Sequence, residues 1–383
     1  MEQFRERWNS LLRANPASSI FQTPEWLASW WQAYGQNRNL FALVFADSTG
    51  AVVGIAPLYA DKTRFLGSRL TTLRMVGAGT GDSDGLDFIT APGYAIDCAQ
   101  AFIRWLAASQ TEWHVCALET LPQRSPVANY LLQRIQESGM SIDSTFTPNF
   151  IIDFPPTWAE YVGSLDSSFR PLLTRYPKRL QSRFTVKYSR CEVVDDLETQ
   201  LQTLFDLHQM RWTGRGETGA FAGDARRDFY RRMTAAFLQR GWLEFWLLEL
   251  NGESVGAQFC FRYNDTVSLL QEGFHPKYAS EKIGYALKAH LLQVMISSGA
   301  RRYDFLGGAD PYKAKFGAHQ ENYLNLFIGG SPKRGRMYLQ VQKQKRAMKA
   351  WLKRKLPAGM VAALRGHATA RAAEPPRQTS QSE

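Results

Sequence analysis

Apolar and polar positions follow two similar series along the chain, and each series predicts an α/β unit. In the first series, apolar residues at helical spacing predict helices over residues 24–34, 95–110 and 127–138. Short apolar runs predict strands over residues 40–46, 52–59, 73–76, 87–89 and 114–119. The polar segment at residues 47–50 is typical of a hairpin turn. Strand pairs followed by alternating helices and strands indicate a mixed sheet with helices on it.

The second series repeats this order without repeating the sequence. Helices are predicted over residues 158–164, 197–215, 225–240 and 284–298, and strands over 243–250, 253–263, 266–274, 302–306 and 323–328. Asn251-Gly252 predicts a tight hairpin turn. In the basic segment 168–187 we expect helix only in part, because Pro177 interrupts it. Pro148, Pro155 and Pro156 predict a boundary near residues 149–156, and therefore domains over 1–150 and 151–330.

Charge is concentrated near the C-terminus. The 383 residues carry a net charge of +11, and residues 333–355 contain ten Lys or Arg and no Asp or Glu. The rest of the chain is therefore almost neutral. We expect a basic helix within residues 331–366 that touches an anionic membrane surface, and a disordered tail over residues 367–383, which are rich in Ala, Pro, Ser and Gln.

The positions of the cysteines and histidines limit which disulfides and metal sites the chain can form. Cys98, Cys116, Cys191 and Cys260 are far apart, and the six histidines show no ligand spacing. This pattern argues against a disulfide framework and against a zinc site, so we expect no metal. Charges interrupt the N-terminus at once, and no run of about 18 apolar residues occurs. We therefore expect a cytoplasmic protein that contacts the inner face of the membrane peripherally.

The segment with the most chemical information is the loop over residues 281–286, which opens directly onto a predicted helix. The first N–H groups of a helix and its dipole favour anions, so a pyrophosphate fits there. Gly284 has no Cβ and permits a close approach to the backbone. Lys282 adds positive charge.

Several motifs occur in an order that resembles the CelD/FemABX-like (BioF2-like) branch of the GNAT acyltransferase superfamily. Gly284 and Ala286 match the last two positions of the acyl-CoA loop Gln/Arg-x-x-Gly-x-Gly/Ala, whereas Glu281 stands where Gln or Arg is usual. The other motifs are Phe21-Gln22-Thr23-Pro24-Glu25-Trp26, Gly54-Ile55-Ala56-Pro57-Leu58, Leu207-His208-Gln209-Met210-Arg211-Trp212, Tyr303-Asp304-Phe305-Leu306-Gly307-Gly308 and Tyr312-Lys313-Ala314-Lys315-Phe316-Gly317.

This resemblance implies two GNAT-like domains in tandem, with mixed, mostly antiparallel sheets and the active domain second. It implies acyl transfer, most simply from acetyl-CoA, to an amine or hydroxyl of a sugar, a polysaccharide precursor or an amino compound. The family often serves envelope, cellulose or exopolysaccharide synthesis. The residues expected to hold the acyl-CoA are Phe274, Tyr278, Lys282, Ile283, Gly284, Tyr285 and Ala286.

Acyl transfer also needs a base for the acceptor and an acid for the leaving thiolate. Tyr312 is the expected acid, although it could simply pack against the sheet. Asp304 and Glu272 are the candidate bases, and either could instead cap a helix or pair with an arginine. The residues expected to contact the acceptor are His208, Arg211, Trp212, Asp84 and Lys313. For each of these a structural role remains open.

Two alternatives remain. A Fem-type ligase would take an aminoacyl group from tRNA and hold the RNA through basic segments, but residues 194–250 contain no heptad segment for the usual coiled-coil insertion. Nucleic acid is therefore not expected as a partner of the acyl-CoA-dependent branch. A degenerate GNAT fold could instead act as a scaffold for a polysaccharide synthase, because the carboxylate of Glu281 would repel a pyrophosphate unless it points away.

Overall fold

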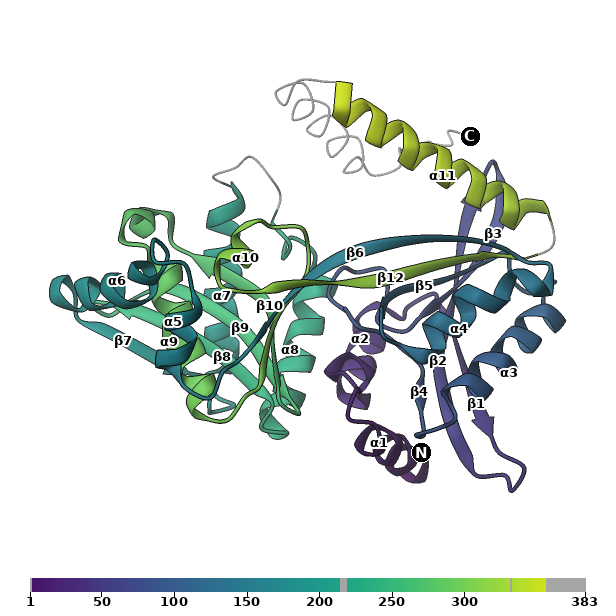
Figure 1. Cartoon of the computed structure of the whole chain (residues 1–383), viewed down its shortest axis with the longest axis horizontal. Coiled ribbons are helices and arrows are strands. Elements are labelled where there is room, and N and C mark those ends of the chain that lie inside the picture. The colour runs from purple at the N-terminus through teal and green to yellow at the C-terminus, as the bar shows by residue number, and fades with distance from the viewer. Residues whose placement is uncertain (1, 214–218, 331–332, 356–383) are drawn as a thin grey trace, which may run out of the picture.

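The chain forms an elongated α/β protein in a computed structural model that describes residues 2–213, 219–330 and 333–355 (Figure 1). The tail expected over residues 367–383 lies outside these ranges. The first half consists of α1 (Glu2–Ala14), the 3-10 helix η1 (Ile20–Gln22), α2 (Pro24–Tyr34), β1 (Asn39–Ala46), β2 (Val52–Phe65), β3 (Ser68–Met75), β4 (Ile89–Thr90), α3 (Ala95–Ala108), β5 (Val115–Pro122), α4 (Pro126–Arg134), η2 (Ile135–Ser138) and β6 (Ser141–Asp153).

The second half is separated from the end of β6 by the four residues 154–157. It consists of α5 (Trp158–Ser164), α6 (Arg170–Arg183), β7 (Val186–Arg190), α7 (Leu197–Thr213), α8 (Asp224–Gln239), β8 (Leu243–Leu250), β9 (Glu253–Tyr263), β10 (Thr266–Phe274), η3 (Pro276–Glu281), α9 (Ile283–Ser297), β11 (Arg302–Gly307), α10 (Tyr312–Lys315), β12 (His319–Gly329) and α11 (Lys333–Lys355).

The two halves share one mixed, mostly antiparallel sheet. Among the described residues its strand order is β1-β2-β3-β5-β12-β6-β11-β10-β9-β8-β7, and β4 pairs with β2. Each half contains one parallel pair, β3 with β5 and β10 with β11. A helix crosses over between the strands of each pair, α3 in the first half and α9 in the second. The predicted fold class and the repeated architecture are therefore confirmed.

The halves are joined by an exchange of strands. β6 leaves the first half and pairs with β11 of the second, and β12 returns from the second half and pairs with β5 of the first. β6 and β12 also pair with each other along their length. These two strands form the bridge between the halves in Figure 1. The proline-rich segment that predicted a boundary near residues 149–156 thus overlaps the end of β6, which the apolar pattern did not reveal.

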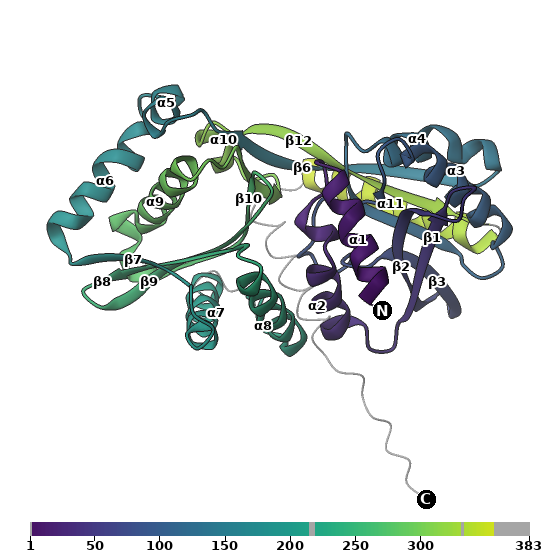
Figure 2. The same ribbon diagram turned by 90° about the horizontal axis from the view of Figure 1, so that it is seen from below.

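Helices cover both faces of the sheet in the second half (Figure 2). There, α6 and α9 lie on one face, and α7 and α8 on the other. The prediction that Pro177 interrupts the helix in segment 168–187 is wrong, because α6 runs through it. An interior proline costs about 3 kcal/mol. Burial of Leu173 and Leu180 offsets that cost, since each buried leucine contributes roughly 1.5–3 kcal/mol.

Trp26 of α2 connects the halves, and both Trp26 and Trp30 hold the loop at residues 77–85. Trp26 stacks on Phe237 and packs edge-on against Phe229, both from α8. Its indole N–H donates to the Ser83 hydroxyl over 2.9 Å, and Trp30 donates to Thr80 over 3.0 Å. The glycine-rich acidic loop at residues 77–85 is therefore held at the interface between the halves.

Candidate active site

A β-bulge in β10 determines which face of the sheet Glu272 occupies. Leu269 lies opposite Cys260 and Gln271 lies opposite Phe259, so one extra residue, Leu270, is inserted between them. Side chains alternate along a strand, and an extra residue reverses that alternation. As a result Glu272 shares the face of Leu269, which is the face that α9 covers. Without the bulge, the carboxylate would point to the opposite face of the sheet.

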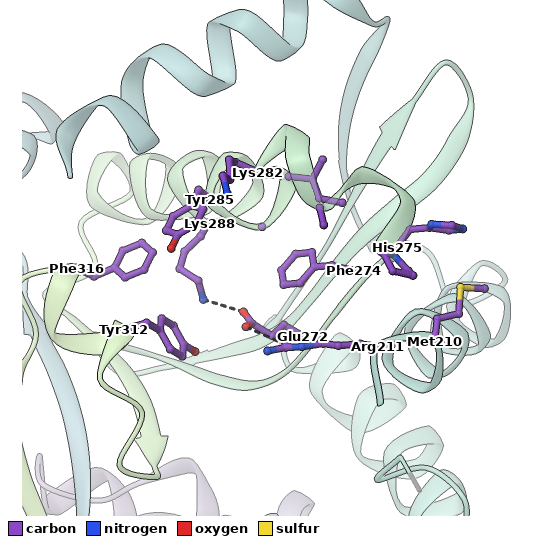
Figure 3. Close-up of a pocket in the computed structure, with 14 residues that line it drawn as sticks. Met210, Arg211, Glu272, Phe274, His275, Lys282, Tyr285, Lys288, Tyr312 and Phe316 are labelled. Atoms are coloured by element: carbon purple, nitrogen blue, oxygen red, sulfur yellow. Dashed lines mark hydrogen bonds and ion pairs between the residues drawn. The ribbon is translucent and has the colours of Figure 1, made fainter. Parts of the chain in front are cut away.

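Glu272 is surrounded by donors from three elements (Figure 3). Lys288 of α9 places its Nζ 3.0 Å from one carboxylate oxygen, and Arg211 of α7 lies 3.5 Å from the other. Gln258 of β9 donates to Glu272 over 3.4 Å. Burial raises the pKa of Glu272, but the charges and hydrogen bonds of Lys288 and Arg211 outweigh it and hold the pKa below its usual value. The group is therefore a carboxylate at neutral pH.

Lys288 is held in an apolar setting. Its side chain is 3% exposed, and its ammonium lies 5.2 Å from the ring centre of Phe305 and 5.8 Å from those of Tyr303 and Phe316. Such ring faces attract a cation, and the carboxylate of Glu272 neutralises it. This ammonium can donate a hydrogen bond to an oxygen that becomes negative inside the cavity.

Tyr312 faces the same space from α10. Its ring packs against Phe305 and Phe316, with centroid distances of 6.2 and 6.4 Å. Burial, and then the negative charge of Glu272, raise the pKa of Tyr312 far above that of a free tyrosine. The hydroxyl therefore stays protonated and can act as a hydrogen-bond donor at every physiological pH.

These side chains line a cavity of about 520 Å³, a size typical of small-ligand sites. The N-terminus of α9 forms its far side. Lys282 caps this helix in the left-handed conformation, with φ = 56°. A Cβ on Gly284 would lie 3.1 Å from the ring of Phe274, so the glycine keeps this wall open. The lining residues are Met210, Arg211, Glu272, Phe274, His275, Pro276, Ala279, Lys282, Ile283, Gly284, Tyr285, Lys288, Tyr312 and Phe316.

Glu281 does not line this cavity. Its two carboxylate oxygens accept hydrogen bonds from Arg183 of α6 at 2.6 and 2.7 Å. The residue that departs from the usual loop pattern is thus paired with a cation on a neighbouring helix. Its negative charge is partly neutralised before any anion approaches the loop.

Only some of the residues predicted to hold the acyl-CoA lie together in the cavity. Phe274, Lys282, Ile283, Gly284 and Tyr285 line the cavity. Tyr278 instead donates its hydroxyl to Glu253 over 2.6 Å, and Ala286 is buried in the core of the second half.

Of the predicted catalytic and acceptor residues, Tyr312, Glu272 and Arg211 line the cavity, and three others lie elsewhere. Asp304 accepts from the backbone N–H of Leu306 over 2.7 Å, and Asp84 accepts from that of Gly307 over 2.8 Å. Lys313 donates to four backbone carbonyl groups at the end of β11, at 3.2–3.4 Å. These three side chains hold the end of β11.

His208 and Trp212 are the two remaining residues that were predicted to contact the acceptor. The ring of His208 packs edge-on against Phe221, with centroids 5.0 Å apart. Burial, together with the positive charges of Arg211 and Arg226, lowers the pKa of His208 to about 4, so the ring is neutral. The side chain of Trp212 lies outside the part of the chain that the structure describes.

Sequence reasoning missed Lys288, which is central to the site. A signal for it exists, because Lys288 is the one Lys, Arg, Asp or Glu in the mostly apolar segment 283–296 and lies one helical turn after Gly284. A cation on the buried face of a helix needs a partner inside the protein.

Comparison with known proteins indicates a GNAT fold. Residues 167–314 match a family model described as an acetyltransferase (GNAT) domain. A search of curated proteins found no significant match. Among solved structures, FemX has a TM-score of 0.61 at 11% identity, over 88% of this chain and 98% of FemX.

Two other structures have similar folds. One is the C-terminal domain of a protein described as a lysylphosphatidylglycerol synthetase from Agrobacterium fabrum, with a TM-score of 0.50 at 13% identity over 89% of this chain and 96% of that chain. The other is a conserved protein of unknown function from Bacteroides thetaiotaomicron, with a TM-score of 0.54 at 10% identity over 85% and 97%. At these identities the similarities show the fold alone.

The family match and the fold together define a GNAT-fold protein, with a GNAT acetyltransferase domain over residues 167–314 in the second half of the chain. The fold of the whole chain is similar to that of FemX. In the part of the chain that the structure describes, no helix is long and apolar enough to span a membrane. The same described residues contain no group of three or more His, Cys, Asp or Glu side chains placed to hold a metal.

Proposed function

We propose that the protein transfers an acyl group from acyl-CoA, most simply acetyl-CoA, to an amine or hydroxyl of a sugar, a polysaccharide precursor or an amino compound. The observation that carries this proposal is one continuous cavity. It joins the N-terminus of α9, which suits a pyrophosphate, to Glu272, Lys288 and Tyr312, which suit a carbonyl group under attack. The family's link to envelope or exopolysaccharide synthesis makes a saccharide acceptor our first choice.

Each charged group has a role in the proposed reaction. The ammonium of Lys288 donates a hydrogen bond to the acyl oxygen as it becomes negative. The carboxylate of Glu272 accepts the proton that the acceptor N–H or O–H releases when its bond to the acyl carbon forms. The carbon–sulfur bond then breaks, and the hydroxyl of Tyr312 stabilises the leaving thiolate by a hydrogen bond. Because the pKa of Tyr312 is so high, the thiolate receives its proton from Glu272 or water rather than from the tyrosine.

Calorimetric titration of the full chain with acetyl-CoA tests this function. We expect Lys282→Glu to weaken binding about tenfold, because it places a negative charge at the helix N-terminus. Lys277→Glu is the matched control, since Lys277 is exposed on η3 and does not line the cavity. Absence of binding to the wild-type protein at millimolar acetyl-CoA would exclude the acyl-CoA-dependent function.

An aminoacyl-tRNA-dependent ligase is the second candidate, because the fold is similar to that of FemX. The exposed cations Arg175, Lys178 and Arg179 of α6 would then contact the RNA beside α9. This candidate predicts tRNA binding that weakens steeply as salt is raised, whereas the acyl-CoA-dependent enzyme does not need RNA. A non-catalytic scaffold predicts neither acetyl-CoA nor tRNA binding.

We also propose that α11 brings the protein to the cytoplasmic face of an anionic membrane. The helix is fixed to the first half by buried Leu339 and by an ion pair between Arg346 and Asp143. Near this ion pair Met348 is 63% exposed, and the cations Lys345 and Lys349 are exposed beside it. Apolar side chains among cations favour a lipid headgroup surface over RNA.

Vesicle sedimentation tests this localisation. The protein should sediment with phosphatidylglycerol-containing vesicles and not with pure phosphatidylcholine vesicles. Lys345→Gln/Lys349→Gln should reduce binding by about 2 kcal/mol, since each cation near an anionic surface contributes roughly 1 kcal/mol. Equal sedimentation of this variant and the wild-type protein would contradict the proposal.

A further inference from the structure

A second cavity, of about 200 Å³, lies between the two halves. The segment 16–21 and the loop residues Asp84 and Gly85 close it from the first half. Side chains of β10, β11, β6 and β12 form its floor. On β10 these are Thr266 and Ser268, which alternate with the α9-facing Val267 and Leu269. The second cavity is therefore on the sheet face opposite to that of Glu272.

Asp84, Asp304 and Asn149 place side-chain oxygen acceptors among the residues that line this second cavity. Asp84 and Asp304 each use a carboxylate oxygen to hold a backbone N–H of residues 306–307. The second oxygen of Asp304 accepts from the hydroxyl of Tyr323 over 3.3 Å. Asn149 of β6 is 2% exposed, and its side-chain carbonyl oxygen has no hydrogen-bond partner. A buried acceptor without a donor costs about 1–3 kcal/mol, so a donor from outside the chain would stabilise this oxygen.

The cations near the second cavity are committed to other groups. Arg302 pairs with Asp153 at 3.1 Å and with Glu321 at 3.3 Å. Lys313 is surrounded by the four carbonyl groups at the end of β11. Burial raises the pKa of Asp84, and burial followed by the charge of Asp84 raises that of Asp304 to about 6. The charged residues that line the second cavity are therefore three acidic ones, Asp84, Asp304 and Glu321, against the single cation Arg302, which is already paired.

We propose that this cavity between the halves binds a small primary ammonium group. An ammonium group has three N–H donors and no acceptor, which matches Asp84, Asp304 and the carbonyl oxygen of Asn149. A cation buried here is paired with carboxylates, as a buried charge must be. The volume admits a short aliphatic amine and excludes a sugar nucleotide. This proposal does not depend on the identity of the acyl donor.

Binding of n-propylammonium chloride to the full chain tests the proposal, with 1-propanol and sodium chloride as matched additives. We expect saturable thermal stabilisation by the amine alone. Asn149→Leu should weaken amine binding at least tenfold and should leave the free protein as stable as the wild type or more so, because it removes the unpaired buried oxygen. Asp304→Asn should also weaken binding.

One further variant and one further measurement make the result decisive. Glu272→Gln, on the other face of the sheet, should bind the amine as the wild type does, and Asn149→Leu should still bind acetyl-CoA if the proposed function holds. Amine binding that Glu272→Gln abolishes and Asn149→Leu keeps would assign the amine to the first cavity and overturn the proposal. Equal stabilisation by 1-propanol would overturn it as well.

Discussion

The ammonium of Lys288 lies 3.0 Å from the carboxylate of Glu272, with both groups largely inside the protein. Lys288 comes from the second turn of α9, and Glu272 comes from β10 just beyond its bulge. The pair therefore exists only because the bulge turns Glu272 toward the helix. It supplies a fixed carboxylate and a fixed cation at the base of a cavity that reaches the helix N-terminus.

Removing the cation of this pair should destabilise the fold. We expect Lys288→Met to lower the free energy of unfolding by about 3 kcal/mol, because it leaves a buried carboxylate with less compensation. The Lys288→Met/Glu272→Gln double variant should recover part of that loss. Urea unfolding measures the free energy of unfolding of the single and the double variant. The control is Lys187→Met, which breaks the exposed Lys187–Glu249 pair and should cost under about 1 kcal/mol. Equal losses in the two single variants would contradict the structural role.

Tyr312→Phe should reduce turnover with little effect on acetyl-CoA binding. The variant keeps the ring packing on Phe305 and Phe316 and removes only the hydroxyl. We expect kcat to fall about 10²-fold or more, the range typical of a lost donor at a developing charge. Steady-state kinetics beside calorimetry separates the two effects. Unchanged kcat would assign Tyr312 to packing alone.

Gly273 should be intolerant of a side chain. A Cβ at this position would lie 2.7 Å from the backbone nitrogen of His208 and 2.9 Å from the Cβ of Leu207. We expect Gly273→Ala to displace α7, to move Arg211 away from Glu272 and to cost about 1–3 kcal/mol. Gly163→Ala in α5 is the control, because nothing lies within 4 Å of its Cβ position. Thermal unfolding of both variants checks the contrast, and equal melting temperatures would contradict it.

Asp304 should make stability depend on pH. Its pKa is raised from 3.8 to about 6 in the folded protein, so between these values the folded state binds more protons than the unfolded state. The free energy of unfolding should therefore fall as pH rises from about 4 to 6, by on the order of 2–3 kcal/mol from this group. Asp304→Asn should flatten that slope in urea unfolding measured across this range. An unchanged slope would mean that another carboxyl group is responsible, and Asp87, whose pKa burial also raises to about 6, is the comparison variant.

Local sequence patterns predicted the bounds of those helices and strands whose ends are marked by residues close in the sequence. The predicted bounds of α2, β8, β9 and β10 match the structure, because Thr23 with Pro24, the Asn251-Gly252 turn and strongly apolar runs act within a few residues. β6 and α6 were not predicted correctly for the opposite reason. β6 is half exposed and contains Pro148, and α6 contains Pro177, so pairing and packing with distant segments decide their structure.

By itself the sequence determined the fold class, the helix and loop that could hold an anion, and the candidates Tyr312, Glu272 and Arg211. These depend on periodicity and on motifs that are short in sequence. Only the tertiary structure decided which of the candidates meet. A single inserted residue at Leu270 selects the face of Glu272, and the pairing of Arg183 with Glu281 spans 98 positions. Side-chain direction and long-range pairing are set by the register of the whole sheet, which no local pattern encodes.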